Sequence, residues 1–158
     1  MRRFSILMSL LVLSLTVAGP GMIQNARADP LTNVRAVKLN VGDIGQMGQD
    51  CGLTKDAIEA AFFAPLRQRG IRAVRSATAY RIFVRATTIT YLQESCVSYV
   101  DAQLLVSTRY ADPANNMERA GNVQLWTQGG IHASGRNEHA ATVNSAVGEL
   151  GRNLGSAW

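Results

Sequence analysis

Apolar residues occupy every second position from Arg35 to Val41, which is the period of a half-buried β-strand. The next segment, Gly42 to Gly52, holds four glycines and two aspartates, and this composition predicts an irregular loop. Apolar residues at helical spacing then predict a helix from Lys55 to Arg69, with Thr54 as its N-cap. Pro65 lies inside this pattern, and we expect it to kink or split the helix.

The middle of the chain has the alternation of a long β-hairpin. A short strand is expected from Ile71 to Val74. Apolar and polar residues then alternate from Tyr80 to Ala86 and again from Val100 to Val106, with a turn near Gln93 to Ser95. The pattern predicts two antiparallel strands with one buried face.

The last third of the sequence predicts a loop, a strand and a helix. The polar run from Asp112 to Asn122 indicates the loop, and Val123 to Thr127 begins another strand. A final helix is expected from about Glu138, with Asn137 as its cap. Its apolar stripe has helical spacing and is flanked by three glycines, at Val143, Val147, Gly148, Leu150, Gly151, Leu154 and Gly155. We expect this stripe to face the core, although the spacing is also compatible with a partner helix.

The predicted order is therefore strand, helix, short strand, three further strands and helix. Two helices of this spacing combined with an antiparallel meander are typical of an α+β fold. We expect a two-layer sandwich with a mainly antiparallel sheet and both helices packed on one face.

The amino-terminal 28 residues have the pattern of a secretory signal peptide. Arg2 and Arg3 precede an apolar run from Phe4 to Ala18, and the small residues Ala26 and Ala28 precede an expected cleavage point before Asp29. The apolar run of about 15 residues is shorter than the roughly 20 that a membrane anchor needs. We therefore expect residues 29–158 to form a single periplasmic domain without stable membrane insertion. The cysteine that would accept a lipid in a bacterial lipoprotein is not present near this point.

Loss of this leader changes the charge balance. The chain has 16 basic and 11 acidic residues. Removal of Arg2, Arg3 and Arg27 leaves 13 basic against 11 acidic residues, a net charge of +2. The remaining cations are spread along the chain, whereas a nucleic-acid surface needs a concentrated basic stripe. We do not expect nucleic acid as a partner.

Cys51 and Cys96 are the only cysteines in the chain. Export to an oxidising compartment makes them a candidate disulfide. The bond would close a loop of about 45 residues and stabilise the fold by roughly 2 to 4 kcal/mol. Two buried free thiols or a reactive thiol pair are the alternatives, but Cys-x-x-Cys spacing is not present.

Catalytic chemistry would have to use His132 or His139, the only histidines. Zinc needs three or four ligands at short spacings, and these two histidines are seven positions apart. Ser134 lacks the preceding glycine of a nucleophile elbow, and cysteine catalysis would contradict the disulfide. We therefore expect no enzymatic activity, no metal and no cofactor.

The glycine-rich loop from Gly42 to Gly52 has three interpretations. Its amides could bind a phosphate, but Asp43 and Asp50 would repel one and no nucleotide-binding motif is present. The same two carboxylates could bind calcium, but the ligand spacing of an EF-hand is missing. We favour a flexible connector that ends at Cys51.

The element order, with a strand at Val123-Gln124-Leu125-Trp126 and a final helix rich in small residues, resembles small domains of the bacterial envelope. These are the amino-terminal domain of the Tol-Pal protein TolB, the penicillin-binding-protein activator lipoproteins and auxiliary lipoproteins of envelope transporters. The resemblance is one of topology and covers most of the chain after the leader. It implies a non-catalytic function, in which loops or a sheet edge bind another envelope protein.

We therefore interpret the chain as a soluble periplasmic protein that recognises another envelope protein. The expected contact surfaces are the Gly42 to Asp50 loop and the exposed rows of the hairpin. Candidate contact residues are the aspartates of the loop and the aromatic and arginine residues of the strands, namely Asp43, Asp50, Arg81, Arg85, Tyr99 and Trp126. A small-molecule or metal-binding module is the first alternative and a small hydrolase the second. A concave apolar pocket with a few polar groups would favour the binding module. No pattern in the sequence predicts the oligomeric state.

Overall fold

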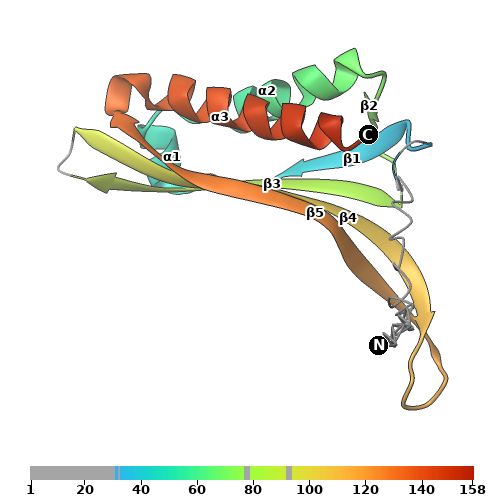
Figure 1. Ribbon diagram of the computed structural model, residues 1–158. Coiled ribbons are helices and arrows are strands. Elements are labelled where there is room, and N and C mark those ends of the chain that lie inside the picture. The colour runs from blue at the N-terminus through green and yellow to red at the C-terminus, as the bar shows by residue number, and fades with distance from the viewer. Residues whose placement is uncertain (1–30, 32, 77–78, 92–93) are drawn as a thin grey trace, which may run out of the picture.

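The computed structural model describes residues 31, 33–76, 79–91 and 94–158. One layer is a five-stranded sheet, and the helices form a second layer on one side of it (Figure 1). The predicted α+β fold class is confirmed. The predicted signal peptide, residues 1–28, lies outside the described residues and stays a prediction.

The elements follow one another as β1 (Ala36–Val41), α1 (Gly45–Asp50), α2 (Lys55–Gln68), β2 (Arg72–Ala73), β3 (Tyr80–Tyr91), β4 (Ser95–Ala111), β5 (Glu118–Gly135) and α3 (Arg136–Ser156). The strands lie side by side in the order β2-β1-β3-β4-β5. Strand β1 is parallel to both of its neighbours, whereas β3, β4 and β5 form an antiparallel meander. The sheet is therefore mixed, and its longest ladders are the antiparallel ones that the sequence predicts.

Two predicted loops are partly regular structure. The segment expected to be an irregular connector contains α1, because buried Gly48 lets this helix lie close to Ile44 and Thr88. This contact overrides the low helix propensity of glycine. The polar loop predicted from Asp112 to Asn122 is shorter than expected, because β5 already begins at Glu118. The first residues of β5 are exposed on both faces of the strand. They therefore lack the alternation of apolar and polar residues that predicts a strand.

The two long helices also differ from expectation in detail. Thr54 caps α2 as predicted, with its side chain accepting a hydrogen bond from the amide of Ala57. Helix α2 continues through Pro65 and is not split. Helix α3 begins at Arg136, two residues before the predicted start, and no side chain caps it.

The core lies between the sheet and the two long helices. The buried apolar side chains include, from the sheet, Val37, Ile82, Val84, Val100 and Leu104, and from the helices, Ile58, Phe62, Leu66, Val143, Val147, Leu150 and Leu154. The predicted stripe of the last helix is therefore buried against the core. The indole of Trp158 donates a hydrogen bond to the carbonyl of Val34, which ties the end of the chain to the start of the domain.

Glycines of α3 allow this helix to lie directly against α2. A Cβ added at Gly151 would overlap the carbonyl oxygen of Phe62 and come within 2.9 Å of Pro65 Cγ. At Gly148 the nearest atom would be the carbonyl oxygen of Ala61, at an ordinary contact distance of 3.6 Å. Close packing of α3 on α2 therefore offsets the low helix propensity of these glycines.

This contact generates a matched pair of predictions. Gly151→Ala should lower the free energy of unfolding by about 2 kcal/mol, because the new methyl group forces α2 and α3 apart. Gly148→Ala should be neutral or stabilise the fold by up to about 1 kcal/mol through helix propensity. Urea unfolding followed by circular dichroism measures both values. Equal effects of the two substitutions would contradict the packing.

Candidate recognition surface

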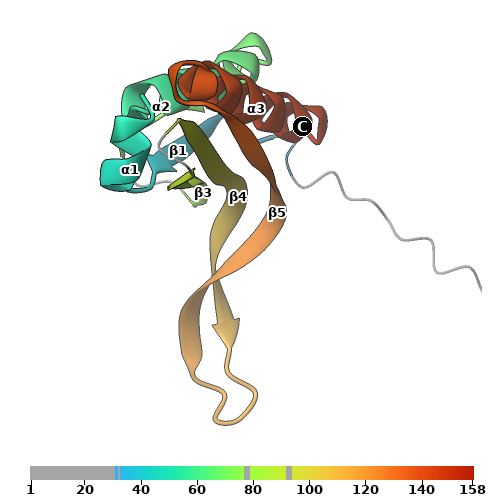
Figure 2. The ribbon, with the colours of Figure 1, turned by 90° about the vertical axis from the view of Figure 1, so that its left-hand side faces the viewer.

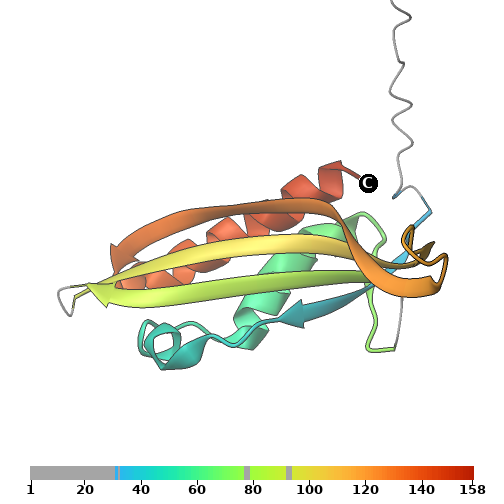
Figure 3. The same ribbon diagram turned by 90° about the horizontal axis from the view of Figure 1, so that it is seen from below.

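The sheet has one side that no helix of the described chain covers, and we call this side the open face. Figure 3 shows it with the strands in front and the helices behind. Its residues alternate along each strand with those that point toward the helices, and the strand registers bring them into rows. The main side chains are Lys38 on β1, Arg81, Phe83, Arg85 and Ile89 on β3, Val97, Tyr99, Asp101 and Gln103 on β4, and Asn122, Thr127 and Ile131 on β5.

An ion pair between Arg85 and Asp101 lies at the centre of the open face. Arg85 Nε and Nη2 donate to the two carboxylate oxygens at 3.0 and 2.9 Å, and Gln103 donates a further hydrogen bond at 3.2 Å. Asp101 is 2% exposed, whereas the Arg85 side chain is 59% exposed. The hydrogen bond and the charge of Asp101 raise the pKa of Arg85 above its usual value. Asp101 therefore holds an accessible guanidinium in one orientation.

Apolar side chains lie next to this pair. Tyr99, 49% exposed, pairs in register with Ile131, 73% exposed. Ile89 and Val97 form the next row. Large apolar side chains with this exposure on adjacent strands are characteristic of contact surfaces. We call Arg85, Tyr99 and Ile131 the central patch.

A second polar ladder crosses the open face nearer to the other end of the sheet. Arg81 Nη2 donates to Ser107 Oγ at 2.5 Å and to Asn122 Oδ1 at 2.7 Å. This interaction ties β3, β4 and β5 together. Both acceptors are neutral, and Arg81 Nε is buried without a hydrogen-bond partner in the described part of the chain. The charge of Arg81 is therefore not balanced by a carboxylate.

Strands β4 and β5 continue beyond β3 as a two-stranded arm. The amide of Ser107 donates to the carbonyl of Ala79, and past this point the hairpin projects away from the helices (Figure 2). Ion pairs join Arg109 to Glu118 and Arg119 to Asp112 within the arm. The charges of the arm are thus satisfied internally, whereas Tyr110 and Met117 are exposed.

The candidate contact residues do not lie in one place. Arg81, Arg85 and Tyr99 share the open face. Trp126 points to the opposite face, where it is half-buried against the core. Asp43 and Asp50 are near α1, in an ion pair with Lys55 at 3.5 Å and a hydrogen bond from Gln46 at 2.8 Å, respectively.

Ile131 and Asp101, which lie at the centre of the open face, were not among the sequence candidates. The prediction covered only the beginning of this strand, Val123 to Thr127, although alternation of Ile131 and Ala133 with the polar residues His132 and Ser134 continues the pattern. Asp101 was assigned only to the polar row of a strand. Its pairing with Arg85 follows from the register of β3 and β4, which the sequence does not specify.

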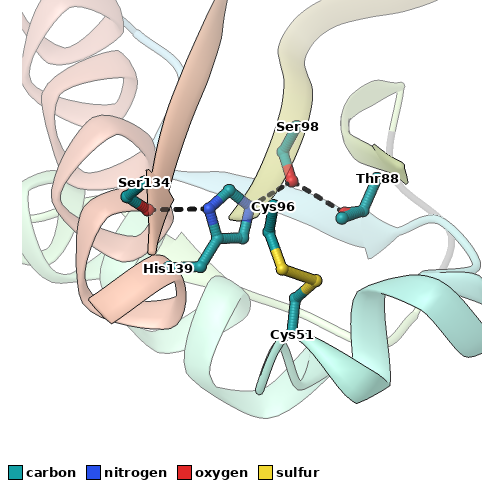
Figure 4. The surroundings of a disulfide bond; sticks show 6 residues. All are labelled: Cys51, Thr88, Cys96, Ser98, Ser134 and His139. Atoms are coloured by element: carbon teal, nitrogen blue, oxygen red, sulfur yellow. Dashed lines mark hydrogen bonds between the residues drawn. A yellow bond between two sulfur atoms is a disulfide. The ribbon is translucent and has the colours of Figure 1, made fainter. Parts of the chain in front are cut away.

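The predicted disulfide between Cys51 and Cys96 is present and buried (Figure 4). It links the end of α1 to β4. A buried hydrogen-bond network lies beside it. His139 Nε2 and Ser98 Oγ are 2.7 Å apart, Ser98 Oγ and Thr88 Oγ1 are 2.7 Å apart, and His139 Nδ1 and Ser134 Oγ are 2.9 Å apart. The network joins the amino-terminal end of α3 to β3, β4 and β5.

Burial controls the chemistry of His139. The residue is 0% exposed, and both ring nitrogens contact hydroxyl groups. Its pKa is lowered from about 6.5, first by burial and then by the charge of His132. Ser134 and His139 do form a hydrogen-bonded pair, but Ser98 occupies the position where a hydrolase needs a carboxylate. In this conformation the imidazole is closed to substrate.

Among the hollows of the described chain, two adjoin α2 and lie away from the open face. One, of about 660 Å³, is between α2 and β2 and is lined by Asp56, Glu59, Phe63, Arg67 and Arg72 among others. The other, of about 420 Å³, is where α1 meets α2. The first hollow contains acidic and basic side chains in similar number, which is unlike the mainly apolar lining of a typical small-molecule site.

Two further findings concern metal ions and membranes. Among the described residues, no group of three or more His, Cys, Asp or Glu side chains is arranged to hold a metal ion. Within the same residues, no helix has the length and apolar character needed to cross a membrane.

No protein family model matches the chain, and no curated protein matches it. Solved structures that are similar to it include the following three. A PelC dodecamer from Paraburkholderia phytofirmans is 15% identical with a TM-score of 0.45, over 76% of this chain and 85% of that one. A minor lipoprotein from Acinetobacter baumannii is 11% identical with a TM-score of 0.37, over 77% and 90%. A protein assigned as a lipoprotein from Caulobacter crescentus is 13% identical with a TM-score of 0.32, over 76% and 85%.

Two of these three neighbours are described as lipoproteins. At TM-scores below 0.5, the likenesses support no conclusion about function or assembly.

The disulfide generates a stability prediction. The double variant Cys51→Ser/Cys96→Ser should lose about 2 to 4 kcal/mol of unfolding free energy, because the unfolded chain is no longer restricted by the crosslink. Urea unfolding of the variant should match that of the wild-type protein in dithiothreitol. A wild-type protein whose stability does not change on reduction would contradict this prediction.

His139 generates a prediction about pH. Its pKa is lower in the folded protein than in the unfolded chain, so below about pH 6.5 the unfolded chain binds a proton that the folded protein does not. The stabilising effect of the neutral imidazole is therefore complete above pH 6.5 and is lost as pH falls toward the lowered pKa. Unfolding free energies measured between pH 8 and pH 5 should show this decline.

His139→Gln is the test variant and His132→Gln is its control. The decline in stability attributed to His139 should disappear in His139→Gln and persist in His132→Gln, which retains the buried imidazole. If His139→Gln kept the wild-type pH dependence, another group would be responsible.

Proposed function

We propose that this protein is an exported, non-catalytic recognition protein of the bacterial periplasm that binds another envelope protein through its open face. The observation that carries this proposal is the central patch. Arg85, Tyr99 and Ile131 are exposed side by side on the one face that the helices leave bare.

The central patch lowers the entropic cost of binding a partner. Interface energy is concentrated in a few aromatic and arginine side chains, and ordering mobile side chains opposes association. Arg85 is already oriented by two hydrogen bonds to a buried carboxylate. Tyr99 projects from a central strand that pairs on both sides. The central patch is therefore preorganised for contact.

Two features support the periplasmic location. Residues 1–28 have the pattern of an export signal. The disulfide between Cys51 and Cys96 is of a kind that persists in oxidising compartments.

The rival functions have weaker support. A hydrolase based on Ser134 and His139 would need an accessible imidazole, and His139 is fully buried. A small-molecule site between α2 and β2 would bring a ligand against side chains of both charge signs. Neither arrangement accounts for the exposed apolar residues on the open face.

The proposal is tested by capturing the partner of the exported protein. Affinity-tagged wild-type protein and the variant Tyr99→Thr/Ile131→Thr would be crosslinked with formaldehyde in the source bacterium, purified and quantified by mass spectrometry. Threonine keeps the strand propensity of these positions. The variant should recover at least tenfold less of one envelope protein, because two contact side chains are removed.

Met117→Thr is the matched control, since it removes an equally exposed apolar side chain from the arm. It should recover the partner at the wild-type level. Equal recovery by the double variant, or no specific envelope protein with the wild type, would contradict recognition through the open face.

A further inference from the structure

Charge on the open face specifies the kind of partner it fits, an inference that rests on the proposed function. On β1, β3 and the parts of β4 and β5 that lie beside them, the open face carries three cations, Lys38, Arg81 and Arg85, and a single acid, Asp101. Asp101 is already paired with Arg85. Lys38 and Arg81 are adjacent in the parallel register of β1 and β3, and neither forms an ion pair within the described chain.

We propose that the open face binds a segment of another protein that is acidic at one end and apolar at the other. Its carboxylate lies against Lys38 and Arg81, and its apolar side chain lies on Tyr99 and Ile131.

The requirement for an acid follows from desolvation. A partner that covers the open face removes water from Arg81, whose hydrogen bonds go to the neutral groups of Ser107 and Asn122. Burying a cation that has no carboxylate partner is unfavourable unless the binding partner supplies a carboxylate next to it. The neutral pair of Arg85 and Asp101 imposes no such requirement. The carboxylate is therefore needed at Arg81 and Lys38.

The register also gives the length of the segment. Tyr99 pairs with Thr87, which is six residues along β3 from Arg81. At about 3.3 Å per residue, the cationic and apolar ends of the site are roughly 20 Å apart. An extended segment of about six or seven residues spans this distance.

A protein segment fits these features better than an anionic membrane. Recognition of anionic lipid by charge requires clusters of about four to eight Lys or Arg residues. Of the open-face cations on β1, β3, β4 and β5, only Lys38 and Arg81 lack a carboxylate partner within the described chain, and they lie at one end of the apolar surface. A membrane or a second copy of this chain would be identified by the experiment as a different occupant.

The experiment places the photo-crosslinking residue p-benzoyl-phenylalanine at position 131 of the full chain in the source bacterium. The adduct is digested and sequenced. We expect one envelope protein, crosslinked through a segment with Asp or Glu about six residues from the attachment point. Insertion at position 64, an exposed site on α2, is the control and should not capture this protein.

Charge removal then tests the acidic end. Lys38→Gln/Arg81→Gln should reduce the adduct at least tenfold, and Lys55→Gln, which removes a cation from α2, should leave it unchanged. Glutamine at position 81 retains a side-chain amide as donor for Ser107 and Asn122. Thermal unfolding confirms that each variant is folded, and Lys38→Gln alone serves if the double variant is not.

A second measurement does not depend on variants. The identified segment, made as a fluorescent peptide, should bind wild-type protein several-fold more weakly at 300 mM than at 50 mM NaCl.

The outcomes distinguish the two proposals. An adduct that survives charge removal, a peptide without acidic residues or an affinity independent of salt would overturn the acidic segment and leave recognition in place. Capture of lipid or of a second copy would overturn the acidic segment as well. No specific adduct from position 131 would overturn both proposals.

Discussion

The close contact of α2 with α3 sets the arrangement of the helix layer on the sheet. Gly151 brings the backbone of α3 against the carbonyl of Phe62, so the two helices form one compact layer. This layer buries the apolar row of the sheet formed by Ile82, Val84, Val100 and Leu104. Because both long helices lie on the same side, the other side of the sheet has no cover in the described chain (Figure 1).

On the open face, the buried carboxylate of Asp101 is satisfied by side chains of neighbouring strand positions. Asp101 is nearly as buried as the core, yet Arg85 and Gln103 supply its hydrogen bonds from neighbouring strand positions. A buried carboxylate without such partners would be strongly unfavourable. On the helix-covered face, the buried imidazole of His139 is hydrogen-bonded to the hydroxyl groups beside the disulfide. In both places polar contacts join several elements, so they also hold the strands in register.

The candidate site was partly predictable. Alternation along β3 and β4 separates exposed Arg81, Arg85 and Tyr99 from the core row, because side chains of a strand point to opposite faces in turn. Alternation does not indicate which candidates share a face. Trp126 belongs to the helix-covered side because a bulge between Leu104 and Leu105 shifts the register of β5. Ile131 belongs to the open face for a reason equally remote in sequence, namely its pairing with Tyr99.

Periodicity is sufficient to predict the fold class and the buried stripe of the last helix, and the presence of only two cysteines leaves a single possible disulfide. The parallel position of β1, the helix between Gly45 and Asp50, and the contact of α3 glycines with α2 emerge only in the folded chain. The same holds for the position of Arg85 beside Asp101 and for the lack of an acid beside Arg81 within the described residues. These features depend on strand register and on backbone approach between distant segments, and neither quantity is encoded in a local pattern.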